Sequence, residues 1–166
     1  ANTSARRLST LRRFYQFLNA ERIRGDDPSN GLDSPRLTKS LPKFLSELEV
    51  DRLLAAAHNR PGADGLRISA LMEILYAAGL RVSELVGLPL SAISRDGHLL
   101  TFRGKGNKER MVPLSEPAMD SVAAYLPVRT NFLSKRQDRV DAGFLFPSRG
   151  RSGHLTRVWF YQVLKE

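Results

Sequence analysis

The stretch from residue 98 to residue 114 constrains the fold most, because the local sequence preference changes there from helix to strand. Residues 98–103 and 109–114 are short runs of strand-forming residues, and Gly-Lys-Gly-Asn-Lys lies between them at 104–108. Glycine and asparagine supply the positive φ angles of a tight hairpin turn. Helical patterns dominate elsewhere, so the sequence predicts a mainly α fold with one small antiparallel β-hairpin.

Apolar residues at helical spacing mark the other ordered segments. The first helix is predicted over residues 8–23, with arginines between its apolar positions. Ser46 and Glu49 form a capping box, because a hydroxyl and a carboxylate at this spacing satisfy free backbone donors. Gly79 suits a left-handed helix end. Further helices are predicted at about residues 66–78, 82–86, 115–126 with Ser115 as its cap, and 156–166.

Two segments lack helical pattern. Residues 25–42 hold glycine, proline, aspartate and asparagine at a density that cannot sustain a helix, which predicts a linker or wrapping loop. We therefore expect a domain boundary there, with the opening helix as the last element of a domain otherwise missing. The polar segment 129–141 gives no clear structural pattern.

The charge favours a polyanionic partner. Twenty-six Lys and Arg residues against seventeen Asp and Glu leave a net charge of +9, with a pI of about 10.5. Such an excess is typical of nucleic-acid-binding proteins, although a solvated basic surface has the same composition. The absence of cysteine excludes disulfides and thiolate metal sites. No apolar run reaches the length of a membrane span, so we expect a cytoplasmic protein without a membrane partner.

Arg81 is the first candidate for chemistry. It lies where one predicted helix ends and the next begins, beside free backbone donors at the positive end of the new helix. A guanidinium there can bind two phosphate oxygens in fork geometry. Glu84 lies one turn along the same face and could hold Arg81 in position. An ordinary capped helix with a surface arginine has the same local sequence.

Lys105, at the tip of the predicted hairpin, is the second candidate. A glycine-rich turn that carries cations can approach a DNA backbone closely, and an amine among phosphates can deliver a proton to a leaving oxygen. A solvated charged turn is the alternative. The segment is not a nucleotide-binding P-loop, because the required Gly-x4-Gly-Lys-Ser/Thr spacing is absent.

Together the two strings resemble a known family. Gly-Leu-Arg-Val-Ser-Glu-Leu at 79–85, followed by Gly-Lys-Gly-Asn-Lys-Glu-Arg at 104–110, is similar to the first-arginine box and the hairpin lysine of the tyrosine recombinase (phage integrase) family. Each motif alone is weak, whereas their order and spacing are specific. The resemblance covers nearly the whole chain, and further stretches that agree with it are residues 27–29, 41–43, 112–114 and 145–147.

The resemblance implies a domain organisation and an incomplete catalytic fold. Residues 1–24 would be the last helix of an N-terminal core-binding (SAM-like) domain, and residues 25–42 the interdomain linker. Residues 43–166 would form the N-terminal part of the catalytic domain, which we expect to continue beyond the given sequence.

The resemblance also implies a reaction. Family members cut DNA by attack of a tyrosine on a backbone phosphate, forming a 3′-phosphotyrosyl bond and freeing a 5′-hydroxyl, without metal or nucleotide cofactor. Arg81 would stabilise the transition state, Lys105 would act as general acid, and Glu84 would support them. Further expected contacts to DNA are Lys108, Arg110 and Arg157.

Other parts of the family pattern are not found. His154 and Arg157 have His-x-x-Arg spacing, but Val-Trp-Phe-Tyr follows them where the family has a further histidine and a small-residue helix. We therefore interpret them as a loop before a helix and a surface or DNA-facing arginine. We expect packing roles for the four tyrosines, which are Tyr15, Tyr76, Tyr125 and Tyr161.

The sequence thus predicts a fragment of a site-specific DNA recombinase that is inactive alone. The resemblance implies duplex DNA as substrate, a tetramer of recombinase subunits on two DNA sites, possible activation by a DNA translocase, and chromosome dimer resolution in preference to phage or mobile-element integration. A non-catalytic DNA-binding derivative of the family is the main alternative. A basic RNA-binding or structural protein would leave the arginine and lysine motifs unexplained.

Overall fold

The computed structural model describes residues 2–35, 44–134 and 140–165, without the side chains of residues 2, 105, 140 and 141. The chain divides into two compact units, Ala1–Phe44 and Leu45–Glu166, called the first and second unit below. The first unit holds helix α1 (Asn2–Ala20), which starts and ends earlier than the predicted 8–23. Arg12 of α1 donates hydrogen bonds to the Leu32 carbonyl (2.6 Å) and Ser34 Oγ (2.8 Å), so the following loop returns along the helix.

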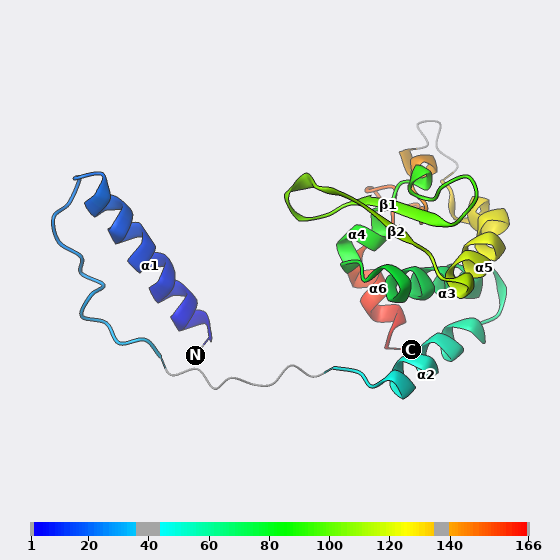
Figure 1. The fold of residues 1–166 in the computed structure, drawn as a ribbon, viewed down its shortest axis with the longest axis horizontal. Helices are drawn as coiled ribbons and strands as arrows, with labels where there is room; N and C mark the ends of the chain where they lie inside the picture. Colours follow the sequence, from blue (N-terminus) through cyan, green and yellow to red (C-terminus); the bar gives the residue numbers. More distant parts are fainter. Residues whose placement is uncertain (1, 36–43, 135–139, 166) are drawn as a thin grey trace. The chain divides into compact units, whose positions relative to one another are not determined.

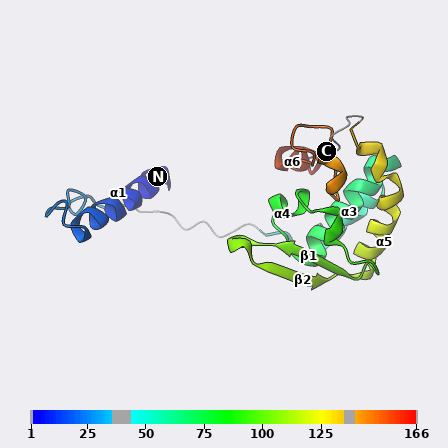
Figure 2. The same cartoon turned by 90° about the horizontal axis from the view of Figure 1, so that it is seen from above.

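The second unit is helical apart from one hairpin (Figure 1), which confirms the predicted fold class. Helix α3 packs against α2, α4 and α5, and Figure 2 shows α3 between α5 and α4. Every residue from Arg67 to Ile74 of α3 is buried, so α3 forms the centre of the core. The described elements of this unit are α2 (Glu47–His58), α3 (Gly62–Ala78), α4 (Val82–Val86), η1 (Leu90–Ala92), β1 (Leu99–Arg103), η2 (Lys105–Asn107), β2 (Glu109–Pro113), α5 (Glu116–Tyr125), η3 (Leu126–Phe132), η4 (Val140–Gly143) and α6 (Arg157–Val163).

The hairpin forms as its residue pattern predicts. Strands β1 and β2 pair antiparallel in a register that runs from Leu99 opposite Pro113 to Arg103 opposite Glu109. Gly106 (φ 77°) and Asn107 (φ 58°) adopt the positive φ angles of the tip. Leu100 and Phe102 are buried, so β1 anchors the hairpin to the core while its tip is exposed.

Helix ends follow the predicted capping chemistry in most places. Ser46 and Glu49 form the capping box: the Ser46 backbone N–H donates to Glu49 Oε2 (2.8 Å), and the Glu49 N–H donates to the serine hydroxyl (3.4 Å). Gly79 ends α3 in the left-handed conformation (φ 58°). Ser115 occupies the N-cap of α5 as predicted, but its side chain makes no capping hydrogen bond. The position was therefore predicted correctly and the capping bond was not.

A buried arginine at the start of the predicted patternless segment contacts the chain at residues 142–145. Arg129 of η3 is 7% exposed. Its guanidinium donates to the carbonyls of Ala142 (2.6 Å), Phe144 (3.0 Å from Nε) and Leu145 (3.3 Å). The Tyr125 hydroxyl also donates to the Leu145 carbonyl (3.1 Å). These side chains add to the backbone bond from the Leu145 N–H to the Leu88 carbonyl (2.8 Å) in holding residues 142–145 to the core.

Arg67, a second buried arginine, joins α3 to η3 and α6. Its guanidinium carbon lies 3.8 Å from the centroid of the Phe132 ring and 4.5 Å from that of the Trp159 ring. Asp64 accepts a hydrogen bond from Arg67 Nη2 (2.5 Å). Burial lowers the pKa of Arg67, and the Asp64 charge opposes that shift. The cation thus packs between two aromatic rings, an arrangement that stabilises a desolvated guanidinium.

Candidate active site

Arg81 occupies the N-cap of the short helix α4, in extended conformation (φ −70°, ψ 147°). The left-handed turn at Gly79 lets the chain leave α3 and start α4 within three residues. The Arg81 backbone N–H donates to Glu84 Oε2 and its Nη1 donates to Glu84 Oε1, both at 2.8 Å. The arginine side chain is nevertheless 61% exposed, against 14% for the glutamate. The less exposed Glu84 therefore holds Arg81 in place, while the arginine side chain stays accessible to solvent.

The hydrogen bonds of this pair favour the ionised form of Glu84. Hydrogen bonds from the backbone N–H and then the side chain of Arg81 lower the pKa of Glu84, with a smaller contribution from the charge of Arg110. An ionised Glu84 fixes the guanidinium rotamer before any ligand arrives, which reduces the entropy lost on binding. The structure thus gives Glu84 the position required for its predicted support of Arg81.

The tip half of the hairpin lies beside this pair. Helix α4 is next to the hairpin in both Figure 1 and Figure 2. An open groove of about 540 Å³ separates them, with Glu84 on one wall and Arg103 on the other. The groove is lined by Ser83, Glu84, Gly87, Leu88, Pro89, Ser91, Ala92, Thr101, Phe102, Arg103 and Glu109. Hydroxyl groups and charged side chains dominate its polar part, as expected of a surface that meets a polar ligand.

The remaining predicted hairpin residues lie near the tip. The backbone of Lys105 begins η2, and its side chain lies outside the described residues. Lys108 is exposed, and its carbonyl accepts from the Gly104 N–H (2.9 Å). Arg110 lies across Gly104: a Cβ at that glycine would be 3.6 Å from Arg110 Nε. The structure therefore places the bonded pair Arg81 and Glu84 beside the hairpin that carries Lys105, with Lys108 and Arg110 near its tip.

Arg157 is the exposed first residue of α6. Helix α6 packs against α4, but no contact between Arg157 and Arg81 is found among the described residues. His154 packs its ring against Phe144, with 4.8 Å between centroids, and its Nδ1 lies 2.7 Å from the Leu155 carbonyl. These contacts give His154 a structural role in the loop before α6.

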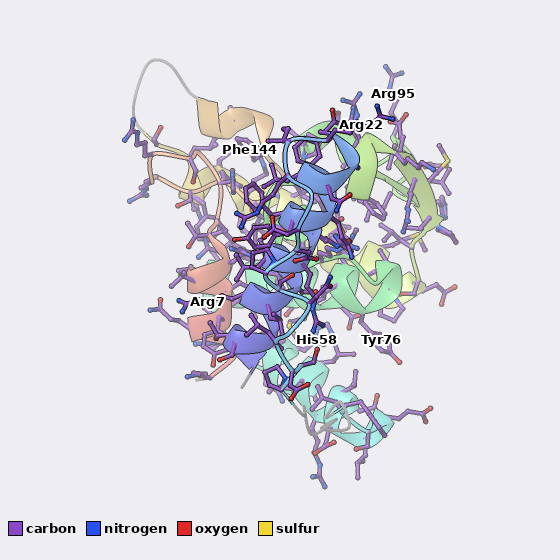
Figure 3. All side chains as sticks on the ribbon, turned by 90° about the vertical axis from the view of Figure 1, so that its left-hand side faces the viewer. Arg7, Arg22, His58, Tyr76, Arg95 and Phe144 are labelled. Carbon is purple, nitrogen blue, oxygen red and sulfur yellow. The ribbon has the colours of Figure 1, made fainter. Side chains whose placement is uncertain are left out.

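The tyrosines differ in exposure. Tyr125 is fully buried and its hydroxyl is bonded, so its packing role accounts for it. Tyr76 is 60% exposed near the end of α3 (Figure 3), and Tyr161 is 59% exposed on α6 beside the ammonium of Lys165. Tyr76 and Tyr161 therefore lie on the surface of this unit, and neither is a core residue.

Neither a metal-binding cluster nor a membrane-spanning helix is found in the described part of the chain. No three His, Cys, Asp or Glu side chains there lie close enough together to hold a metal ion. Within the same residues, no helix combines the length and the hydropathy needed to cross a bilayer.

Known protein sequences that match this chain belong to the family that its arginine and lysine motifs resemble. The sequence profile described as "Phage integrase family" matches residues 43–166. The chain is 48% identical to Tyrosine recombinase XerD of Rhizobium meliloti (strain 1021), a match that covers 99% of the chain and 53% of the relative. It is 47% identical to Tyrosine recombinase XerD of Caulobacter vibrioides, again over 99% of the chain and 53% of the relative. The chain thus spans about half the length of the curated relatives it matches.

Solved structures share the fold. XerA recombinase superposes with a TM-score of 0.60 at 24% identity, over 93% of this chain and 50% of the other. The Tn1549 transposon integrase, solved in complex with circular intermediate DNA, gives a TM-score of 0.66 at 19% identity, over 98% and 55%. The profile match, the XerD relatives and the fold lead to one assignment: this chain belongs to the phage integrase family of tyrosine recombinases.

Proposed function

We propose that this chain carries the Arg81 and Lys105 part of the active site of a site-specific DNA recombinase. The observation that supports it most is the exposed guanidinium of Arg81, which Glu84 fixes next to the hairpin that carries Lys105. A fixed cation that faces solvent is the group needed to bind a phosphodiester and the charge that builds on it.

In the proposed reaction a tyrosine hydroxyl attacks a DNA phosphate, forming a 3′-phosphotyrosyl bond and expelling the 5′-oxygen. Arg81 binds the non-bridging oxygens, whose negative charge grows in the five-coordinate transition state; such a group contributes about 3–4 kcal/mol. Lys105 donates a proton to the departing 5′-oxygen, worth about 10²–10⁴ in rate. The proposal assigns no nucleophile within residues 1–166, and the chain alone is expected to bind DNA without cleaving it.

The proposed domain organisation follows the same family pattern. Residues 1–24 are assigned to the end of a core-binding domain, 25–42 to the linker and 43–166 to the catalytic domain. The family profile begins to match at residue 43, which supports this division. By similarity to XerD, we assign the whole protein to chromosome dimer resolution, in a tetramer on two DNA sites with activation by a DNA translocase.

A covalent-adduct assay tests the catalytic assignment. It uses a longer polypeptide that contains this chain together with a nucleophilic tyrosine, and a suicide substrate that traps the phosphotyrosyl bond. Arg81→Ala should suppress the adduct by about 10²–10³-fold while duplex binding persists. Arg95→Ala is the matched control, because Arg95 is an exposed arginine on the loop before β1 (Figure 3). Normal adduct formation by Arg81→Ala would refute the role of Arg81.

Two further measurements test Lys105 and the DNA partner. Lys105→Ala should lose activity on a normal substrate and regain it on one with a 5′-bridging sulfur, which leaves without protonation. Absence of that rescue would show that Lys105 is not the general acid.

Binding of duplex DNA by the 166-residue chain should weaken steeply with salt, with a log–log slope of about −0.9 for each phosphate neutralised. A flat response would exclude the basic surface as the DNA site.

A further inference from the structure

We propose that a second pocket of this unit, away from the groove at the hairpin, binds a phosphate group. The pocket has a volume of about 490 Å³ and lies between the first turn of α3, η3 and α6. Its described lining includes neither Arg81 nor Glu84, so the inference goes beyond the proposed function and does not depend on it. The polar residues of the lining are Asp64, Arg67, Asn131, Ser148 and Arg149.

Arg67 brings a buried cation with an unused donor to this pocket. The residue is only 7% exposed, and Asp64 Oδ1 accepts a hydrogen bond from its Nη2 (2.5 Å). Its Nε is buried and has no hydrogen-bond partner, and no other buried side-chain nitrogen or oxygen in the described part of the chain lacks one. Leaving a buried, charged N–H without an acceptor is costly. An oxygen that reaches Nε from the pocket would therefore bind favourably.

The first turn of α3 adds backbone donors to the same pocket. Ala63 and Asp64, the second and third residues of the helix, both line it. The first N–H groups of a helix have no acceptor within the helix, and the N-cap residue Pro61 makes no side-chain capping bond to them. Their partial positive charge favours an anion at this end of α3.

The loop before α6 supplies donors from another segment. Arg149 donates from Nη2 to the Asn131 carbonyl (3.0 Å), which holds its side chain against η3, and the residue remains exposed. Ser148 Oγ accepts from the Gly150 N–H (3.3 Å), so the hydroxyl can direct its own proton to a ligand. Donors therefore reach the pocket from α3 and from this loop.

The charge and the distribution of these donors select an oxyanion with several oxygens. Arg67 and Arg149 carry two positive charges against the one negative charge of Asp64. A carboxylate offers two acceptor oxygens, whereas a phosphate group offers at least three to donors that arrive from separate segments. Arginine binds such oxygens in fork geometry. The volume is also within the usual range for small-molecule sites, so a small phosphorylated compound fits better than a bare ion.

A titration of the 166-residue chain with inorganic phosphate tests the site, with ionic strength held constant by chloride. NMR spectra should show saturable shifts of the Arg67 Nε–H and the amides of Ala63 and Asp64. Arg149→Met should weaken phosphate binding about tenfold. The matched control is Arg151→Met, which removes an exposed arginine of the same loop from outside the lining and should change the affinity by less than about twofold. Asp64→Asn should strengthen binding about threefold, because it removes a negative charge and keeps an acceptor for Arg67.

Two results would overturn the proposal. One is the absence of a saturable shift at Arg67 Nε–H. The other is equal weakening by Arg149→Met and Arg151→Met, which would mean a diffuse attraction to the basic surface.

A second titration, with a short DNA duplex, identifies the source of the phosphate group. The same shifts, again weakened by Arg149→Met, would assign the pocket to a phosphate of the DNA backbone. A duplex that leaves the three signals unchanged, where inorganic phosphate shifts them, would assign it to a free phosphorylated compound. The covalent-adduct assay of Arg81→Ala is independent of both titrations, so failure of this site and failure of the proposed function are distinguishable.

Discussion

Replacing Arg129 by methionine is expected to destabilise the second unit by about 2–4 kcal/mol. The guanidinium supplies hydrogen-bond donors to the carbonyls of Ala142, Phe144 and Leu145. All three carbonyls lose the arginine donor, but the Leu145 carbonyl keeps its bond from the Tyr125 hydroxyl. The carbonyls of Ala142 and Phe144 are therefore the two left without a side-chain donor. Each half-buried carbonyl left without a donor costs about 1–2 kcal/mol, since water reaches part of it.

Urea unfolding followed by circular dichroism measures this loss. With a slope of about 2 kcal/mol per molar urea, the midpoint of Arg129→Met should fall by about 1–2 M. Arg149→Met is the matched control, because Arg149 makes one exposed hydrogen bond, to the Asn131 carbonyl (3.0 Å). That variant should stay within about 0.5 kcal/mol of the parent chain.

The opposite result has a clear physical meaning. Among the described side chains no carboxylate contacts Arg129, and burying a cation carries a desolvation cost. Apolar replacements of buried charged groups sometimes stabilise proteins. If Arg129→Met is as stable as Arg149→Met or more stable, desolvation of the guanidinium outweighs its three carbonyl bonds. The view that Arg129 holds residues 142–145 in place would then be refuted.

Three other predictions concern the packing and capping of the second unit. Gly65→Ala should unfold at a much lower temperature than the parent, because its Cβ would lie 1.8 Å from the Arg60 carbonyl oxygen; calorimetry checks this, and an unchanged transition would contradict the α2–α3 packing. Ser46→Ala should cost about 1 kcal/mol in urea unfolding through loss of the α2 cap. Burial raises the pKa of Tyr125 well above the value of 10.0 at which the unfolded chain ionises, so stability should fall as the pH rises above about 10. Tyr125→Phe should lack that fall, and equal alkaline loss in both proteins would show that other groups cause it.

Local chemistry made part of this fold predictable. The hairpin tip needs positive φ at Gly106 and Asn107, and only a few residue types adopt it readily, so the turn could be read from the sequence. Ser46 and Glu49 cap α2 through contacts within one turn, which makes their signal local as well. The same holds for the hydrogen bonds between Arg81 and Glu84, three residues apart.

Long-range contacts of arginine were not predictable in the same way. Arg129 stands in a polar stretch where nothing in the spacing distinguishes a buried cation from an exposed one, and its partners are backbone carbonyls that any sequence has. The groove that Glu84 shares with Arg103 depends on how the hairpin packs beside α4, over 19 positions of sequence. The bounds of α1 were misjudged because the polar residues at its start extend the helix without adding to its apolar stripe.

The packing of Trp159 on Arg67 gives the protein an intrinsic fluorophore at an informative place. Trp159 is the single tryptophan of the sequence, and its indole lies 4.5 Å from the guanidinium carbon of a residue on α3. Its emission spectrum will respond when α6 detaches from α3, because the ring then exchanges a cationic neighbour for water. Undocking of this helix can therefore be timed in unlabelled protein, separately from global unfolding.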